Sequence, residues 1–304
     1  MTKVLDVEIA GIKLRNPLML ASGVVGSNPL LYRRAWEEGA GAIVTKTFTV
    51  EKREGNISPI IIGVPCGYIN AVGLENPGIE YIEKVVRFLK SNNIATIVSI
   101  AGRTIDEFLR LALKSRDCGA DAIELNLSCP HVRGMGMELG HDGTFVVKLI
   151  RSIKEEVDIP IFPKFGYSPR LTNLLKLAEI AGADGVVIIN TIRSMRIDVW
   201  IHKPVLSNKY GGLSGPAIHP IAVSCVYEAY EVLDIPIIAS GGAWSWEDVI
   251  EFILAGARAV QIGSIIGEKG LNVFREILQG IERYLKENNL SHINRLVGLA
   301  HIDD

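Results

Sequence analysis

Short apolar runs recur along the chain, and several are entered through a glycine that follows a helical stretch. The runs GAGAIV, GADAIEL, GADGVVI and GARAVQI share this form and occupy Gly39–Val44, Gly119–Leu125, Gly182–Ile188 and Gly256–Ile262. Glycine suits the left-handed position at the end of a helix. A continuous β-branched run suits a parallel strand that is buried on both faces. The pattern therefore predicts repeated units in which strands alternate with helices.

A second phrase, Asp-Ile-Pro-Ile, opens two further apolar runs at Asp158 and Asp234. Proline is tolerated at the first residue of a strand, where its missing N–H costs no ladder bond. With these runs included, we expect strands at 17–20, 42–46, 96–100, 122–126, 161–164, 185–189, 236–240 and 259–262. We expect helices near 29–38, 77–90, 104–116, 142–156, 170–180, 217–231, 245–254 and 270–287.

Eight strands alternating with eight helices favour the α/β class and a closed (β/α)8 TIM barrel over a doubly wound sheet. We expect residues 1–304 to form one domain, because no interdomain linker or low-complexity run interrupts the pattern. An opening hairpin, Val4–Ile9 with Ile12–Leu14, is expected to plug the bottom of the barrel. Two long connections, Phe48–Gly73 and Ile192–Gly215, leave the carboxyl ends of strands. Active sites of such barrels are built at that end, and loops of this length are uncommon unless functional.

Composition narrows the classes of protein that fit. Apolar residues make up 48% of the 304-residue chain and charged residues 22%, which excludes a disordered chain. Thirty-two basic and 34 acidic side chains give a formal charge of −2, without the basic surplus typical of phosphate-dominated nucleic-acid binding. The start of the chain lacks the pattern of a signal peptide, and no apolar run approaches the roughly 18 residues of a spanning helix. We therefore expect a soluble, cytoplasmic protein without membrane or nucleic-acid partners.

The cysteines and histidines carry no metal-binding spacing. Four scattered cysteines without a CxxC pair indicate neither a disulfide framework nor an iron–sulfur or zinc site. None of the six histidines forms an HxH or HExxH pattern, so we expect no metal.

Polar residues gather where the predicted strands end. They are Ser22, Lys46, Thr47, Ser99, Asn126, Lys164, Asn190, Thr191, Ser240, Gly241, Gly242, Gly263 and Ser264. Any one of them could be a hydrogen-bonded strand-end residue, but their recurrence at the same end of nearly every strand favours a ligand site. The glycine turns after the last two strands suit phosphate binding through backbone N–H groups, or are simply tight turns. Lys46 and Lys164 each end an apolar strand and need an anionic partner or a path to water.

Cys129 is the candidate for reactive chemistry. It lies in Asn126-Leu-Ser-Cys-Pro-His131, just past the fourth strand, and is followed by the glycine-rich segment Val132–Gly143, a candidate mobile lid or a plain surface loop. A thiol with an ordinary pKa of about 8.5 is a moderate base near neutral pH. Cys118 and Cys225 are expected to be structural, and Cys66, in the first long connection, is the one competitor.

Several ordered motifs resemble those of the class 1 dihydroorotate dehydrogenases. They run from Asn16 to the C-terminus and read NPLMLASG (16–23), TKT (45–47), NAVGLENPG (70–78), ELNLSCP (124–130), INT (189–191), GGLSGPA (211–217) and SGG (240–242). The resemblance implies an FMN-containing barrel that oxidises dihydroorotate to orotate in pyrimidine biosynthesis. It implies that Cys129 is the catalytic base. It further implies that the substrate is bound by Lys46, Asn70, Ala71, Val72, Gly73, Leu74, Asn126, Asn190 and Thr191.

The same resemblance implies a set of FMN contacts. These are Ser22, Lys46, Thr47, Ser99, Asn126, Lys164, Ile189, Gly215, Gly241, Gly242, Gly263 and Ser264. Ser99 stands where many relatives have asparagine. The chemistry agrees, because asparagine can both donate to and accept from the amide-like edges of a planar anionic pyrimidine. Lys164 could stabilise negative charge on a reduced flavin.

The branch of the family decides the electron acceptor. The C-terminal region GGAWSWEDVIEFILAGARAVQIGS (241–264) is similar to the NAD-linked type B catalytic subunits, which pair with a subunit that carries FAD and a [2Fe–2S] cluster. The resemblance therefore implies a homodimer core within a heterotetramer. The fumarate-using homodimeric branch is the alternative. This chain has His131 where many relatives have asparagine. The segment SCPHVRGMG (128–136) that contains it also resembles the uracil- and thymine-reducing domain of dihydropyrimidine dehydrogenase, which is a second alternative. An RNA dihydrouridine synthase and a non-catalytic barrel are further alternatives.

Overall fold

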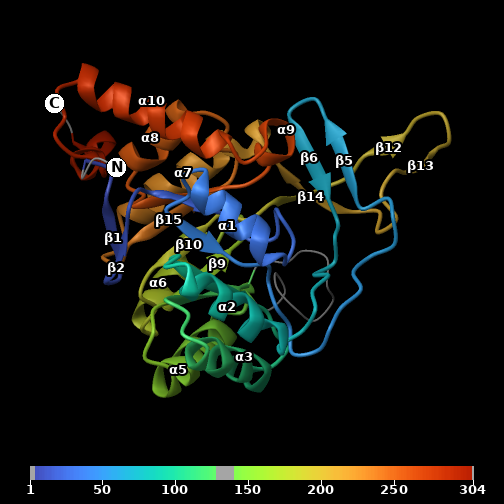
Figure 1. Ribbon diagram of the computed structural model, residues 1–304. Coiled ribbons are helices and arrows are strands. Elements are labelled where there is room, and N and C mark those ends of the chain that lie inside the picture. Colours follow the sequence, from blue (N-terminus) through green and yellow to red (C-terminus); the bar gives the residue numbers. More distant parts are fainter. Residues whose placement is uncertain (1–3, 128–139, 303–304) are drawn as a thin grey trace.

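The computed structural model describes residues 4–127 and 140–302. Eight parallel strands close into a barrel in the order in which they occur along the chain, and helices surround them (Figure 1). The barrel strands are β3 (Leu18–Leu20), β4 (Ala42–Val44), β7 (Thr96–Ile100), β8 (Ala122–Asn126), β9 (Ile161–Phe165), β10 (Val186–Ile188), β15 (Ile237–Ser240) and β16 (Ala259–Ile262). All eight predicted strands are confirmed, with ends that differ by at most two residues.

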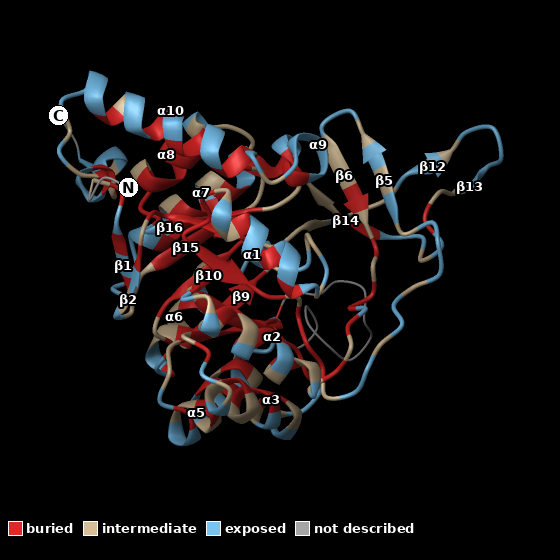
Figure 2. Ribbon diagram, in the orientation of Figure 1, coloured by how far each residue is buried: buried red, intermediate tan, exposed pale blue. Residues whose placement is uncertain are grey.

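The helices that follow the strands bury one apolar face against the barrel (Figure 2). They are α1 (Pro29–Glu37), α2 (Tyr81–Ser91), α3 (Ile105–Asp117), α5 (Gly143–Glu156), α6 (Leu171–Ile180), α7 (His219–Tyr230), α8 (Trp246–Leu254) and α10 (Val273–Glu287). In α2, for example, Ile82, Val85, Val86 and Leu89 are buried at helical spacing. The barrel strands are buried on both faces, as the continuous apolar runs predict.

Three helix starts differ from prediction by two residues or more. The helix expected from residue 77 begins at Tyr81. The helix expected from residue 270 begins at Val273, and a separate short helix, α9 (Ile266–Lys269), precedes it and is divided from α10 by Gly270, which takes a positive φ of 71°. The stretch expected from residue 217 begins with the 3₁₀ turn η1 (Pro216–Ile218). Two further 3₁₀ turns, η2 (Ile293–Leu296) and η3 (Leu299–His301), follow α10.

The two long connections contain strands, which the sequence pattern did not indicate. β5 (Ile61–Val64), β6 (Gly67–Asn70), β11 (Ile192–Ser194) and β14 (Gly211–Ser214) form one antiparallel sheet in the order β11-β14-β6-β5. β12 (Ile197–Asp198) and β13 (Lys203–Pro204) make a hairpin that extends from this sheet (Figure 1). The pairing of Gly212 with Asn70 joins segments about 140 positions apart, and a local pattern carries no signal for such a contact.

The N-terminal hairpin is confirmed as β1 (Val7–Ile9) paired with β2 (Ile12–Leu14). Figure 1 shows it on the far side of the barrel from β5 and β6. Its buried residues Val7, Ile9 and Leu14 belong to the same apolar core as the barrel strands. The hairpin thus covers the apolar end of the barrel that lies opposite the long connections.

Candidate active site

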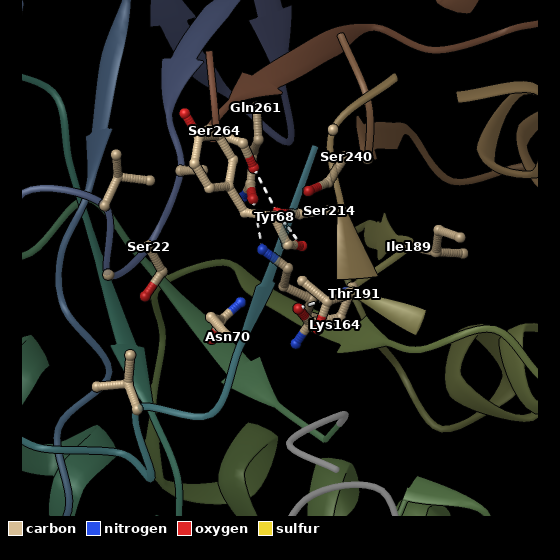
Figure 3. Close-up of a pocket in the computed structure, with 18 of the residues that line it drawn as sticks. Ser22, Tyr68, Asn70, Lys164, Ile189, Thr191, Ser214, Ser240, Gln261 and Ser264 are labelled. Carbon is tan, nitrogen blue, oxygen red and sulfur yellow. Dashed lines mark hydrogen bonds between the residues drawn. The ribbon is translucent and has the colours of Figure 1, made fainter. Parts of the chain in front are cut away.

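A cavity of about 370 Å³ lies at the carboxyl ends of the barrel strands, beside the antiparallel sheet (Figure 3). Ligand pockets commonly have volumes of about 300–1,000 Å³. Most of the predicted site residues line it: Ser22, Lys46, Thr47, Asn70, Val72, Gly73, Leu74, Asn126, Lys164, Ile189, Asn190, Thr191, Gly215, Gly241, Gly242, Gly263 and Ser264. The barrel therefore brings together residues that are spread over nearly 250 positions of the sequence.

Two predicted residues are placed differently. Ser99 and Ala71 are fully buried and do not line the cavity. Ser99 lies beneath it, on β7, and Ala71 is held by a backbone bond to Ile60. Direct contact between either side chain and a ligand is therefore not supported. Cys129, like His131, lies outside the described residues.

Lys46 follows β4 and is positioned by its backbone. Its N–H donates to the hydroxyl of Tyr32 at 2.7 Å, and this hydroxyl donates to the carbonyl of Gly26 at 2.5 Å. Tyr32 is 1% exposed, and burial raises the pKa of its phenol. The Lys46 Nζ lies beside Gly23, since a Cβ built on that glycine would sit 3.6 Å from it. Tyr32 thus couples the loops that follow two neighbouring strands, a role that sequence reasoning missed.

Amide side chains reach the cavity from three elements. Asn126 ends β8 and donates to the hydroxyl of Thr47 at 3.2 Å. Asn70 ends β6 and donates to the carbonyl of Gly212 at 3.3 Å, which ties it to the adjacent strand β14. Asn190 follows β10, and its side-chain oxygen accepts from the N–H of Thr191 at 2.8 Å. Such a set can both donate to and accept from a planar ligand with amide-like edges.

A chain of hydroxyls runs from the cavity to a buried carboxylate. Ser99 donates to Glu124 at 3.0 Å, so its single hydrogen is used there. Thr47, 2.9 Å from Ser99, must then donate to Ser99 and accept from Ser22 at 3.1 Å. All hydrogens in the chain point toward Glu124. As a consequence, Ser22 offers the cavity only the acceptor capacity of its oxygen.

Glu124 and Gln261 are site residues that sequence reasoning missed. Both line the cavity and both are buried, with exposures of 1% and 3%. Gln261 donates from Nε2 to Glu124 at 2.7 Å and accepts at Oε1 from Lys164 at 2.6 Å. A charged residue and an amide that face inward in otherwise apolar strands were the available signal. The anionic partner that Lys164 requires is therefore within the protein, because its Nζ lies 3.8 Å from Glu124.

The glycine turns at the cavity have a packing explanation. Gly242 has a φ of 85°, and a Cβ there would meet backbone atoms of His219 at 2.6 Å. A Cβ on Gly215 would lie 2.7 Å from the Cα of Gly67. A Cβ at Gly263, in contrast, would make only ordinary contacts at 3.6 Å and beyond. Close packing alone requires glycine at positions 242 and 215. Only the position of these turns at the cavity, and not the presence of glycine in them, favours phosphate binding.

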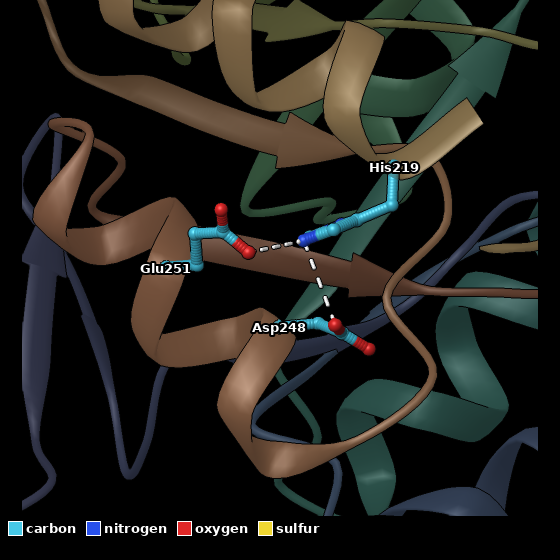
Figure 4. Close-up of side chains that lie close together, drawn as sticks. All are labelled: His219, Asp248 and Glu251. Atoms are coloured by element: carbon cyan, nitrogen blue, oxygen red, sulfur yellow. Dashed lines mark hydrogen bonds and ion pairs between the residues drawn. The ribbon is translucent and has the colours of Figure 1, made fainter. Parts of the chain in front are cut away.

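His219, at the start of α7, meets two carboxylates of α8 (Figure 4). Its Nε2 lies 2.8 Å from Glu251 and 3.5 Å from Asp248. These three residues form a group that could in principle hold a metal ion. However, Asp248 already accepts from the N–H groups of Trp244 and Ser245 and completes a capping box at the start of α8. The group is best explained as an anchor for the turn that carries Gly242 and Trp244 to the cavity.

The described cysteines lie away from the cavity lining. Cys225 is buried within α7, and burial raises the pKa of its thiol to about 11. Cys118 caps α3 and is partly buried, whereas Cys66 is exposed at the turn between β5 and β6. The structural interpretation of Cys118 and Cys225 agrees with these positions. Among the described residues, no helix combines the length and apolarity needed to cross a bilayer.

Comparison with known proteins supplies the family. The family model described as dihydroorotate dehydrogenase matches residues 4–285. A relative from Pyrococcus furiosus, named dihydroorotate dehydrogenase B (NAD(+)), catalytic subunit, is 47% identical over 303 residues, covering 97% of this chain and 98% of its own. A Pyrococcus abyssi protein of the same name is 48% identical and covers 97% and 99%. A protein from Aeropyrum pernix, 43% identical with 98% and 97% covered, has a provisional name as dihydroorotate dehydrogenase A (fumarate). The chain belongs to the dihydroorotate dehydrogenase family.

Proposed function

We propose that this chain is the catalytic subunit that oxidises (S)-dihydroorotate to orotate with FMN in pyrimidine biosynthesis. Membership of the family implies dihydroorotate oxidation with a flavin, and we propose that this flavin is FMN. The observation that carries the proposal is the meeting of Lys46, Asn70, Asn126 and Asn190 in one cavity with the buried Lys164. These residues provide cationic and amide groups for a planar, anionic substrate at the end of the barrel where such sites are built.

The cavity suits FMN in shape and in chemistry. One wall contains the turns at Gly241–Gly242 and Gly263–Ser264, which follow the last two strands and suit a phosphate group. Ile189, Ile218 and Trp244 provide apolar surface for a ring system. Lys164 would face negative charge on that ring. When bound, the flavin would supply the acceptor for a hydride from C6 of the substrate.

We infer that Cys129 removes the C5 proton of dihydroorotate. Support comes from the sequence alone, because Cys129 follows Asn126 by three residues within ELNLSCP, the segment that matches the family's catalytic loop. Within the described part of this segment, Glu124 and Asn126 line the cavity. The thiolate is the basic form of cysteine, so the proton transfer requires ionisation of Cys129.

For the electron acceptor we propose NAD⁺, reached through a partner subunit that carries FAD and a [2Fe–2S] cluster. The name catalytic subunit, shared by the Pyrococcus relatives, implies a partner subunit, and the cofactors proposed for that partner follow from the resemblance to the type B enzymes. The four scattered cysteines of this chain do not supply the spacing of cluster ligands. Fumarate is the competing acceptor, and the Aeropyrum relative is the specific observation in its favour.

We further propose a homodimer core within a heterotetramer, and a cytoplasmic location. Exposed apolar side chains support a protein contact: Val199, Trp200 and Ile201, at the tip of the β12–β13 hairpin, are 69%, 88% and 62% exposed. Apolar groups of this size gathered on a surface commonly mark an interface. Scattered cysteines without a disulfide framework suit a reducing compartment.

The decisive experiment is anaerobic. The purified chain is loaded with FMN, freed of excess, and mixed with dihydroorotate, while the loss of oxidised flavin absorbance is followed. We expect rapid bleaching by dihydroorotate and none by dihydrouracil. Bleaching by dihydrouracil alone, or a chain that retains no flavin, would overturn the proposal. Reoxidation by NAD⁺ only in the presence of the copurified partner, and not by fumarate, is expected for the type B assignment.

A further inference from the structure

We propose that Glu124, acting through Gln261, is a positioning residue that fixes the ammonium of Lys164 in the cavity and offsets its charge. The proposal rests on the proposed binding of FMN. It concerns three buried side chains on three strands: Glu124 on β8, Lys164 on β9 and Gln261 on β16. Gln261 and Glu124 lie in segments that the sequence pattern assigned to strands, and neither residue was given a role in the site.

The geometry defines a relay of fixed polarity. The Lys164 Nζ donates to Gln261 Oε1 at 2.6 Å (Figure 3), and Gln261 Nε2 donates to Glu124 Oε2 at 2.7 Å. A carboxylate can only accept, and an ammonium can only donate. Gln261 therefore has one permitted amide orientation. The second oxygen of Glu124 is occupied by the Ser99 hydroxyl at 3.0 Å, which prevents the carboxylate from rotating freely.

Because these three side chains are buried, the relay costs free energy unless each of its hydrogen bonds and its ion pair is formed. Lys164, Gln261 and Glu124 are 5%, 3% and 1% exposed. A buried charge that loses its partner is strongly destabilised, because little water reaches it. At 3.8 Å, Glu124 is close enough to cancel much of the field of Lys164. A ring bound in the cavity would thus meet a lysine that is fixed in direction and partly neutralised.

This arrangement has a consequence for redox chemistry. A flavin gains negative charge on reduction, so nearby positive charge favours the reduced form. If Glu124 offsets Lys164, removing the carboxylate exposes the full charge of the lysine and raises the reduction potential of bound FMN. Moving the carboxylate to position 261, in direct contact with Lys164, should instead keep the potential at or below that of the wild type.

Two variants test the expected order of the reduction potentials. In Glu124→Gln, Lys164 loses its counter-charge. The new amide can keep the bond from Gln261 Nε2 only if its oxygen faces Gln261, which turns its NH2 toward Ser99 and requires that hydroxyl to accept instead of donate. In the double variant Glu124→Gln/Gln261→Glu, the amide now at position 124 accepts from Ser99 and donates to the carboxylate now at position 261. That carboxylate in turn accepts from Lys164. Every hydrogen bond of the relay is retained, and only the position of the carboxylate changes.

The midpoint potential of bound FMN is measured anaerobically against reference dyes, after gel filtration removes free flavin. We expect Glu124→Gln to raise the ratio of reduced to oxidised flavin at least tenfold at a fixed solution potential, which corresponds to about 30 mV for a two-electron couple. The double variant should lie at or below the wild type. Glu179→Gln is the matched control, since it removes a carboxylate from the Lys176–Glu179 pair, which lies outside the cavity lining; its potential should equal that of the wild type.

An unchanged or lowered potential in Glu124→Gln would overturn the inference while leaving the proposed function intact. Should that variant fail to fold or to hold flavin, the double variant decides: a potential above that of the wild type would overturn the inference, and one at or below it, in a folded protein, supports it. A wild-type chain that binds no FMN would remove both the proposed function and this inference.

Discussion

The hydroxyl of Tyr32 accepts a hydrogen bond from the backbone N–H of Lys46, so a residue of the first helix fixes the position of a cationic residue in the cavity. The bond is 2.7 Å long, and the same hydroxyl donates to Gly26. Because Tyr32 is buried, water cannot easily replace the hydroxyl if it is removed. The loops after β3 and β4 thus depend on one oxygen atom of α1.

Replacing Tyr32 by phenylalanine should destabilise the protein and weaken substrate binding. Leaving the Lys46 N–H without a partner costs about 1–3 kcal/mol. Urea unfolding should show this loss, and the KM for dihydroorotate should rise while flavin remains bound. Tyr227→Phe is the control, because its hydroxyl makes only a long 3.4 Å bond near the surface. Equal stability of the two variants would contradict the role assigned to Tyr32.

The barrel could be predicted from sequence because its signals are local. Each Gly-led run, such as Gly182–Ile188, reports the end of a helix and the start of a buried strand within a few residues. The strand-end residues Asn126, Lys164 and Asn190 could be predicted as a group for the same reason. Once the barrel was expected, the carboxyl ends of its strands had to meet.

The parts of the site that could not be predicted from sequence depend on contacts that no local pattern encodes. The pairing of β14 with β6 joins two segments that each appeared to be a loop. Gln261 appears as one polar residue inside an apolar run, and only the closed barrel places it between Lys164 and Glu124. Ser99 appeared to be a ligand residue because strand direction alone does not show which side chains lie beneath others.

Replacing Cys129 by serine should slow dihydroorotate oxidation far more than it affects flavin binding. A positioned general base contributes about 10²–10⁴-fold to rate, and serine ionises at a much higher pH than cysteine. Stopped-flow reduction of FMN by dihydroorotate measures the effect. In the wild type the rate should increase with pH as the thiol ionises near its ordinary pKa of about 8.5. A flat profile from about pH 6 to 9, or a serine variant of normal rate, would exclude Cys129 as the base.

Introducing negative charge at Asn190 should oppose an anionic substrate. Asn190→Asp keeps the shape of the side chain and its acceptor for the Thr191 N–H. It places a like charge in the cavity, where repulsion between charges about 4 Å apart amounts to roughly 4 kcal/mol at an effective dielectric constant of about 20. We expect the KM for dihydroorotate to rise at least about tenfold, which needs only about 1.4 kcal/mol. Asn294→Asp, at an exposed position outside the cavity lining, is the control and should leave KM unchanged.

Alkaline conditions should destabilise the fold in part through Cys225. Burial raises the pKa of this thiol to about 11, well above its ordinary value. Between these values the unfolded chain releases the thiol proton while the native protein retains it. The unfolded state then binds fewer protons, so the free energy of unfolding falls as pH rises from about 9 to 11. Tyr32 contributes in the same direction at somewhat higher pH, because burial also raises the pKa of its phenol. Urea midpoints measured across this range should decline less steeply in Cys225→Ala than in the wild type. Parallel declines would show that the ionisation of Cys225 does not limit alkaline stability.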